Sequence, residues 1–230
     1  MTQVSRQRIV ELKTQAKNRR DLKRWDRAAA LLKQAIGLAE EEYHSTGARE
    51  WRATMASELA DCWGILGGLE RRWALDPASN AKQRLEHLQR SIEAYDKGYE
   101  YEKESLSSGI NTYNMLNRLL VRLLLAPELL ATDRGAAGET MNVRAELEKV
   151  AEQISRHATD SVWTAADMAL LNILLKRQDA ASAYAAFERM EPPDFARQSA
   201  LDVLIPLAQL DLPIAAELRD AARRLGARRG

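Results

Sequence analysis

The sequence contains little cysteine, phenylalanine or proline. Its 230 residues include one cysteine, two phenylalanines and six prolines. Cys62 has no second cysteine to pair with in the chain, and its place beside Trp63 on an apolar helix face predicts a small core residue rather than a nucleophile. No window approaches the roughly 18 uncharged apolar residues of a membrane span, and the N-terminus lacks the apolar segment of a secretory signal. The sequence therefore predicts a cytoplasmic protein that does not span a membrane.

An excess of charge of one sign is also missing. The chain has 34 basic and 33 acidic residues and a net charge of +1, so no global field recruits nucleic acid or anionic lipid. A local run could contact nucleic acid, but its one aromatic residue, Trp25, is already required for helix packing, and a solvated helix face is the favoured interpretation. The run consists of Lys17, Arg19, Arg20, Lys23, Arg24 and Arg27.

Helix formers dominate the composition, and no alternating β-branched run is long enough for a strand, which predicts an all-α fold. We expect about ten antiparallel helices that stack as a tetratricopeptide-like solenoid in a single domain over residues 1–230. Residues 126–140 are expected to form a flexible insertion, and residues 226–230 a frayed tail. The expected helices cover residues 4–18, 25–43, 49–73, 81–102, 110–125, 141–157, 161–175, 180–190, 195–210 and 213–225.

A repeated spacing of small and large residues supports this repeat architecture. Three of the expected helices each carry a set of three residues at positions i, i+4 and i+7, with a large residue at i+4. This spacing places the three residues of a set on one helix face. A small residue lets the neighbouring helix approach, and the large residue fills the space beside it. Glycines at 64, 67 and 68 inside one helix also predict the close approach of another helix, or of a ligand. The predicted packing residues are Ala28, Leu32, Ala35, Ser91, Tyr95, Gly98, Ala183, Phe187 and Met190.

Three segments resemble a known family. These are DCWGILGGLERRW at residues 61–73, LEHLQRSIEAYDKGYEYE at residues 85–102, and SSGIN at residues 107–111 before a leucine-rich helix. They resemble the tetratricopeptide-type TRAFs-binding region of the apoptosis signal-regulating MAP kinase kinase kinases and its bacterial relatives, where the patterns are close to LGILGRIYKDRW, AIEAYRKGFELDP and YPGIN. The resemblance extends over roughly residues 59–210.

The resemblance implies a regulatory role. In the kinases the region implies protein binding beside an effector domain, and in bacteria a signalling module that is sometimes thought to sense nucleotide-derived ligands. The sequence departs from the family motif at residues 67–72, where the first Arg, the Tyr and the Asp are lost and only the Lys position stays basic, as Arg71. Any family site built on that Arg and Asp is therefore in question here.

One polar stripe is a candidate binding site. Asn111, Asn114 and Arg118 share a helix face, with Asn117 at its edge. Asparagine is a poor helix former because its amide competes for backbone partners, so a stripe of asparagines indicates hydrogen bonding to another group. Two alternatives stay open: the amides satisfy neighbouring backbone groups, or together with Arg71 they clamp an anionic partner or ligand on the concave side.

No catalytic set accompanies these residues. The three histidines lack partners at a metal-ligand spacing, and no phosphate-binding loop or nucleophile motif is present, so we expect no catalytic residues, metal or cofactor. The sequence predicts a non-enzymatic scaffold or adaptor in a signalling or defence system, which binds another protein, such as an effector enzyme, protease or kinase encoded nearby. The alternative is a sensor or processing module for a small anionic, nucleotide-derived ligand. A membrane partner is not expected.

Overall fold

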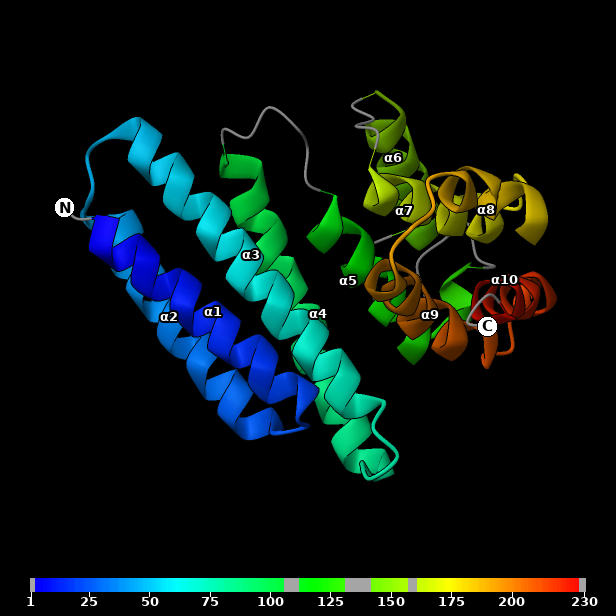
Figure 1. The fold of residues 1–230 in the computed structure, drawn as a ribbon, viewed down its shortest axis with the longest axis horizontal. Coiled ribbons are helices and arrows are strands. Elements are labelled where there is room, and N and C mark those ends of the chain that lie inside the picture. Colours follow the sequence, from blue (N-terminus) through cyan, green and yellow to red (C-terminus); the bar gives the residue numbers. More distant parts are fainter. Residues whose placement is uncertain (1–2, 106–111, 131–141, 157–160, 228–230) are drawn as a thin grey trace. The chain divides into compact units, whose positions relative to one another are not determined.

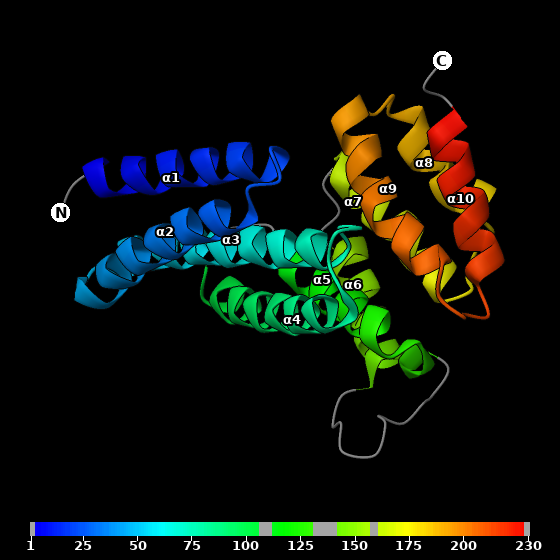
Figure 2. The same cartoon turned by 90° about the horizontal axis from the view of Figure 1, so that it is seen from below.

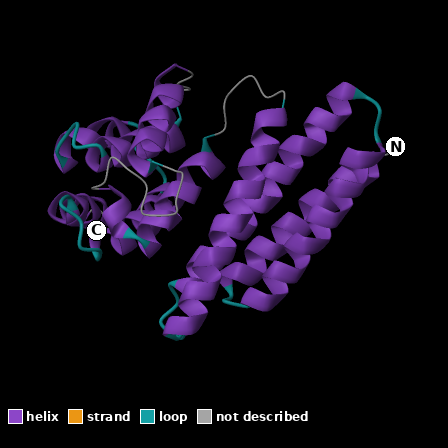
Figure 3. Ribbon diagram, turned by 180° about the vertical axis from the view of Figure 1, so that it is seen from behind, coloured by secondary structure: helices purple, strands orange, loops and turns teal. Residues whose placement is uncertain are grey.

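The computed structural model describes residues 3–105, 112–130, 142–156 and 161–227. Within these residues the chain forms ten α-helices and one short 3₁₀ helix, η1, with no strand, which confirms the all-α prediction (Figure 3). In chain order the elements are α1 (Gln3–Asp21), α2 (Trp25–Ser45), α3 (Arg49–Ala74), α4 (Ala81–Glu104), α5 (Tyr113–Leu125), η1 (Pro127–Leu130), α6 (Val143–Arg156), α7 (Val162–Leu174), α8 (Ala180–Arg189), α9 (Asp194–Ala208) and α10 (Ala215–Ala227).

The helices form two compact units, Met1–Val121 and Arg122–Gly230, called unit 1 and unit 2 below. In unit 1 each of α1 to α4 packs against its chain neighbour and runs antiparallel to it (Figure 1). In unit 2 the main contacts join α7 to α8 and α9 to α10. Packing between chain neighbours is the arrangement of a helical repeat. The boundary between the two units lies close to the end of α5, and the single domain over residues 1–230 stays a prediction.

The small/large/small faces of α2 and α4 lie in the core of unit 1. On α2, Ala28, Leu32 and Ala35 are at most 1% exposed. On α4, the Ser91 hydroxyl donates to the Gly67 carbonyl at 2.7 Å, and the Tyr95 ring lies over Gly67 so closely that an added Cβ would be 2.9 Å from it. The glycines of α3 therefore allow a neighbouring helix to approach, as one of the two sequence alternatives expected. Figure 2 shows α3 and α4 side by side.

The corresponding face of α8 departs from the sequence prediction at its last residue. Ala183 and Phe187 are buried, but α8 ends at Arg189, and Met190 follows it as a capping residue that is 37% exposed. Glu191 then takes a left-handed backbone conformation with φ 48° before Pro192 and Pro193. Because proline disfavours the helical conformation in the residue before it, the helix stops too early for Met190 to point into the core.

The predicted insertion at residues 126–140 is not loose throughout. Its first part contains η1, whose Leu129 and Leu130 are buried and which contacts α6. Residues 131–140 lie outside the described part of the chain. At the C-terminus Gly226 and Ala227 still belong to α10, so the predicted frayed tail includes two helical residues, and residues 228–230 are not described.

Several helix ends follow the capping residues that the sequence offers. At the start of α4 the Asn80 side chain accepts from the Gln83 amide at 2.9 Å, and the Gln83 side chain accepts from the Asn80 amide at 3.0 Å, a complete capping box. At the start of α7 the Ser161 hydroxyl accepts from the Thr164 amide at 3.2 Å, a single side-chain cap. These caps fix where α4 and α7 begin.

Candidate functional site

Three of the four predicted binding residues come together inside unit 1. Arg71 lies on α3, while Asn114 and Arg118 lie on α5. Their exposed fractions are 5%, 1% and 8%, so they belong to the interior more than to an open groove. The fourth residue, Asn111, lies outside the described residues. The prediction that this set binds a partner is not tested by the geometry, which shows instead what each side chain touches.

Asn114 is held between three helices. Its Nδ2 donates to the Ala60 carbonyl of α3 at 3.0 Å and to Glu102 Oε1 of α4 at 2.7 Å. The side chain fits there only because Gly64 and Gly98 face it: a Cβ added at either glycine would lie 2.6 Å from an Asn114 side-chain atom. Asn114 thus satisfies a backbone carbonyl of α3, as the first of the two sequence alternatives expected.

Arg71 is a buried cation with one amide partner. Its Nη1 donates to Asn117 Oδ1 at 2.7 Å, and Asn117 Nδ2 donates to the Tyr113 carbonyl at 2.8 Å, so the asparagine is oriented with its oxygen toward the guanidinium. Arg71 Nε has no hydrogen-bond partner, and no carboxylate among the described residues forms an ion pair with Arg71. A buried guanidinium without a counter-charge is costly, by up to several kcal/mol.

Arg118 connects this interior to the surface. Its guanidinium lies over the Tyr99 ring at 4.2 Å, and its Nη1 lies 3.7 Å from Asp96 Oδ1. The Asp96 side chain is 38% exposed, against 9% for that of Arg118. The cation–π contact and the carboxylate hold Arg118 at the edge between α4 and α5.

Glu102 is the member of the site that the sequence did not indicate. Its Oε1 accepts from both the amide and the side chain of Asn114, at 3.2 Å and 2.7 Å, and thereby caps the first turn of α5 from the end of α4. Burial raises the pKa of the Glu102 carboxyl to about 7, although its hydrogen bonds with Asn114 act in the opposite direction. A glutamate in a charged run at a helix end gives no sequence signal for such a role.

A second polar cluster lies between α3 and α4. His87 Nδ1 lies 2.6 Å from Glu70 Oε2, and both side chains are at most 7% exposed. The Trp73 ring stacks on the imidazole with centroids 3.9 Å apart. The partner of His87 is thus 17 residues earlier in the chain, on the facing helix.

A third cluster joins α1 to α3. Lys13 Nζ contacts Glu58 Oε2 at 2.6 Å and Asp61 Oδ2 at 2.7 Å, and Arg6 contacts the other oxygen of Glu58 at 2.9 Å. Burial opposes the charged form of Glu58, but the hydrogen bonds from Lys13 and Arg6 hold the pKa of its carboxyl below its ordinary value. This cluster consists of paired charges with no open coordination position, which fits a role in joining two helices.

Groups suited to covalent or metal chemistry are poorly placed in the described residues. Burial raises the pKa of the Cys62 thiol to about 12, so the thiolate that a nucleophile needs is suppressed. In the same part of the chain no three His, Cys, Asp or Glu side chains form a group that could hold a metal ion. Of the described helices, none is both long and apolar enough to cross a bilayer.

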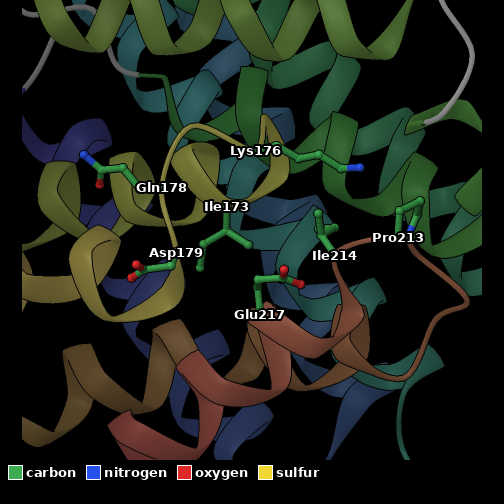
Figure 4. A pocket seen from close by; sticks show the side chains of 7 residues that line it. All are labelled: Ile173, Lys176, Gln178, Asp179, Pro213, Ile214 and Glu217. Atoms are coloured by element: carbon green, nitrogen blue, oxygen red, sulfur yellow. The ribbon is translucent and has the colours of Figure 1, made fainter.

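Unit 2 has a small cleft that contains none of the predicted site residues (Figure 4). It has a volume of about 300 Å³ and lies between the α7–α8 connection and the start of α10. Apolar and charged side chains line it in a mixed pattern. The lining residues are Ile173, Lys176, Gln178, Asp179, Pro213, Ile214 and Glu217.

Comparison with protein families bears on unit 1. The model of the family described as Tetratricopeptide Repeats-Sensor, TPR-S, matches residues 1–124, which is more than half of the 230 residues. The chain belongs to the TPR-S family. Searches of the curated proteins and of the solved structures find no match.

The TPR-S match covers α1 to α4 and all but the last residue of α5, and therefore includes every described member of the predicted binding site. It supports the tetratricopeptide-type part of the resemblance noted in the sequence, but it ends at residue 124 rather than near residue 210. As its description says, the family is a sensor family, which implies a signalling or sensor role. Unit 2 lies almost entirely outside the match.

Proposed function

We propose that this TPR-S chain is a non-enzymatic regulatory module of a cytoplasmic signalling or defence system, which binds an anionic segment of a partner protein at the α3–α5 site. The observation that carries the proposal is Arg71, a residue that is 5% exposed and whose guanidinium bonds to one neutral amide. An incoming carboxylate or phosphate would supply the missing counter-charge, and guanidinium groups match the geometry of both anions.

Arg118 would meet the anion at the edge between α4 and α5, where it lies beside the partly exposed Asp96. Asn117, one residue before it, turns its amide oxygen toward Arg71. A partner that displaces Asp96 from Arg118 would gain a charge-assisted hydrogen bond. The likeness to the TRAFs-binding region of the MAP kinase kinase kinases belongs to the same proposal, because that region implies regulation of an effector through protein binding.

A second candidate is a free small anion, nucleotide-derived, sensed at the same residues. Two observations favour it: the family is described as a sensor, and a compact ligand reaches a buried guanidinium more easily than a folded partner does. Thermal-shift measurements with nucleotides and cyclic nucleotides test it, because a ligand at 100 times its dissociation constant stabilises the protein by about 2.7 kcal/mol. A shift in the wild type that Arg71→Met abolishes would favour the small ligand.

The partner hypothesis is tested by titration of a co-purifying protein. Arg118→Ala should weaken binding by about 1.5–3 kcal/mol, the range for a hydrogen bond to a charged group. Arg8→Ala is a matched control, because Arg8 is an exposed residue of α1 whose partner is Glu11. Equal affinities for the wild type, Arg71→Met and Arg118→Ala would remove this site from consideration.

A non-enzymatic role is part of the proposal. The suppressed thiolate of Cys62 and the pairing of His87 with Glu70 beneath Trp73 support it, since both potential nucleophiles or bases are committed to the core. Incubation of the protein with the nucleotides of the thermal-shift panel, followed by chromatography, checks it. Turnover of any of them would replace the regulatory proposal with a processing activity.

A further inference from the structure

The turn between α1 and α2 carries positive charge that the fold does not neutralise. Arg20 and Lys23 form ion pairs there, with Asp21 and Asp76. Four other cations form no ion pair with the described residues, and one carboxylate, Asp26, is equally unpaired. The apex of the turn also exposes Leu22, at 61%. The basic end, as we name it, consists of the unpaired Lys17, Arg19, Arg24 and Arg27.

The other end of α2 carries the opposite charge. Four carboxylates there form no ion pair with the described residues. Two cations lie beside them at the start of α3: Arg49, which is unpaired, and Arg52, whose guanidinium donates to the Tyr43 hydroxyl at 3.0 Å. Glu42 Oε2 is buried and has no hydrogen-bond partner among these residues. The acidic end, at the close of α2 and the start of α3, consists of Glu40, Glu41, Glu42 and Glu50.

The two ends cannot neutralise each other within one molecule. They lie at opposite ends of α2, which has 21 residues and a length of roughly 30 Å at 1.5 Å per residue (Figure 1). The Debye length at physiological ionic strength is about 8 Å, so their interaction through solvent is screened. In the Lys13 cluster of unit 1, by contrast, opposite charges are paired over 2.6 and 2.7 Å.

We propose that the basic end of one molecule docks on the acidic end of a second copy of this chain. Unpaired charge is in excess at both ends, positive at the basic end and negative at the acidic end, so the two surfaces are complementary in sign. Every copy of the chain therefore carries the binding surface for both ends. Nucleic acid or an anionic membrane would neutralise the basic end only and leave the acidic end unmatched.

The contact joins two different surfaces, so it is head-to-tail and leaves a free basic end and a free acidic end on every dimer. Such heterologous contacts produce rings when the rotation closes and open filaments when it does not. Exposed ion pairs are individually weak, so association depends on several pairs together and on low ionic strength. Leu22 adds apolar contact at the centre of the basic end.

Light scattering of the full chain after gel filtration tests this. In about 20 mM salt the average mass should rise above the 25.9 kDa of the monomer with increasing protein concentration, and in about 500 mM salt it should return to that value. Arg24→Glu/Arg27→Glu and Glu41→Arg/Glu50→Arg should each raise the apparent dissociation constant at low salt at least about tenfold. Lys33→Glu, in the middle of α2, should leave it unchanged.

Mixing the two double variants is the decisive step. The reversed basic end of one matches the reversed acidic end of the other, while neither variant matches itself, so the equimolar mixture should associate although each variant alone is monomeric. Circular dichroism melts show whether each variant folds. A wild type that stays monomeric at low salt, or a mixture that does not associate, overturns the proposal. Binding of the monomer to phosphatidylglycerol vesicles or single-stranded DNA instead would assign the basic end to that partner.

Discussion

Unit 1 and unit 2 are built alike, from helices that contact their chain neighbours, yet they bury different side chains. Every buried polar or charged residue among those described lies between Lys13 and Arg118, in unit 1. The described core of unit 2 is made of apolar residues such as Leu171, Phe187 and Leu218. The family match ends with unit 1 as well. Similar helical packing thus surrounds a partly polar interior in the region that the TPR-S family matches and a largely apolar interior in unit 2.

The contrast has an energetic meaning. Buried polar groups add little net stability, but each must find its partner, so they define a single arrangement of the helices that hold them. In unit 1 the partners are on different helices, as with Asn114 between α3, α4 and α5. A ligand or partner can act on such a network by offering one group a better partner. Such groups are fewer in unit 2, where burial affects Asp167 and the Tyr184 hydroxyl within a largely apolar interior.

The largest effect is expected from a cavity in unit 2. Phe187 is fully buried, so Phe187→Ala should lower the free energy of unfolding by about 3–5 kcal/mol, with Phe187→Leu as a milder control. Hydrogen exchange read by mass spectrometry resolves the two units. Protection should fall in residues 162–227 and remain in α1 to α4. An equal loss of protection in both units would break the division on which the comparison depends.

A smaller effect is expected where unit 1 is packed around a polar side chain. Gly98→Ala places a Cβ 2.6 Å from Asn114 and should cost about 1–3 kcal/mol in urea denaturation. Gly37, also inside a helix, has no atom within 4 Å of an added Cβ, so Gly37→Ala should instead stabilise by up to about 1 kcal/mol. Adding Asn114→Ala to Gly98→Ala should recover part of the loss, because the clash is removed. Equal effects at Gly37 and Gly98 would mean that Asn114 is not clamped.

The sequence predicted most of what periodicity can encode. Helix starts such as Ala81 after Asn80 follow from capping, and the packing role of Ala28 or Tyr95 follows from spacing. It could not predict the buried pairs Glu70–His87 and Glu102–Asn114, because their members lie 17 and 12 residues apart on different helices and no local signal couples them. It placed Asn114 and Arg118 on one face of α5 correctly, but not the depth of their burial.

The titration of Glu102 tests whether the polar interior of unit 1 carries a pH dependence. Because its pKa is raised to about 7 in the folded chain, folding favours the protonated form. This contribution to stability is fully present below the ordinary pKa of glutamate, about 4.5, and is lost as the pH rises through about 7. Glu102→Gln should reduce the change in unfolding free energy between pH 5 and pH 8 by no more than roughly 2 kcal/mol.

Two controls separate unit 1 from unit 2 in that experiment. Glu100→Gln changes an exposed glutamate on the same helix and should leave the pH dependence as it is. Burial also raises the pKa of the half-buried Asp167 of unit 2 to about 7, so Asp167→Asn should remove a separate part of the slope. If Glu102→Gln leaves the slope unchanged while Asp167→Asn removes it, the pH dependence belongs to unit 2 and the comparison is reversed.

The smallest effect is expected at two helix ends that are alike in both units. Lys23 after α1 and Lys176 after α7 have φ of 54° and 56°, the left-handed conformation in which glycine is preferred at such ends. Lys176→Gly should therefore stabilise the chain by about 0.5–1 kcal/mol. Lys23→Gly should stabilise the chain less, because it also removes the surface ion pair of Lys23 with Asp76 at 3.0 Å, worth at most about 1 kcal/mol.

Thermal unfolding in low and high salt separates the contribution of the backbone conformation from that of the ion pair. In high salt, where the ion pair is screened, both substitutions should stabilise the chain equally. Equal gains would show that the two units share the same local backbone rules and differ in what their cores contain, whereas a difference that persists in high salt would place part of the contrast in the helix ends themselves.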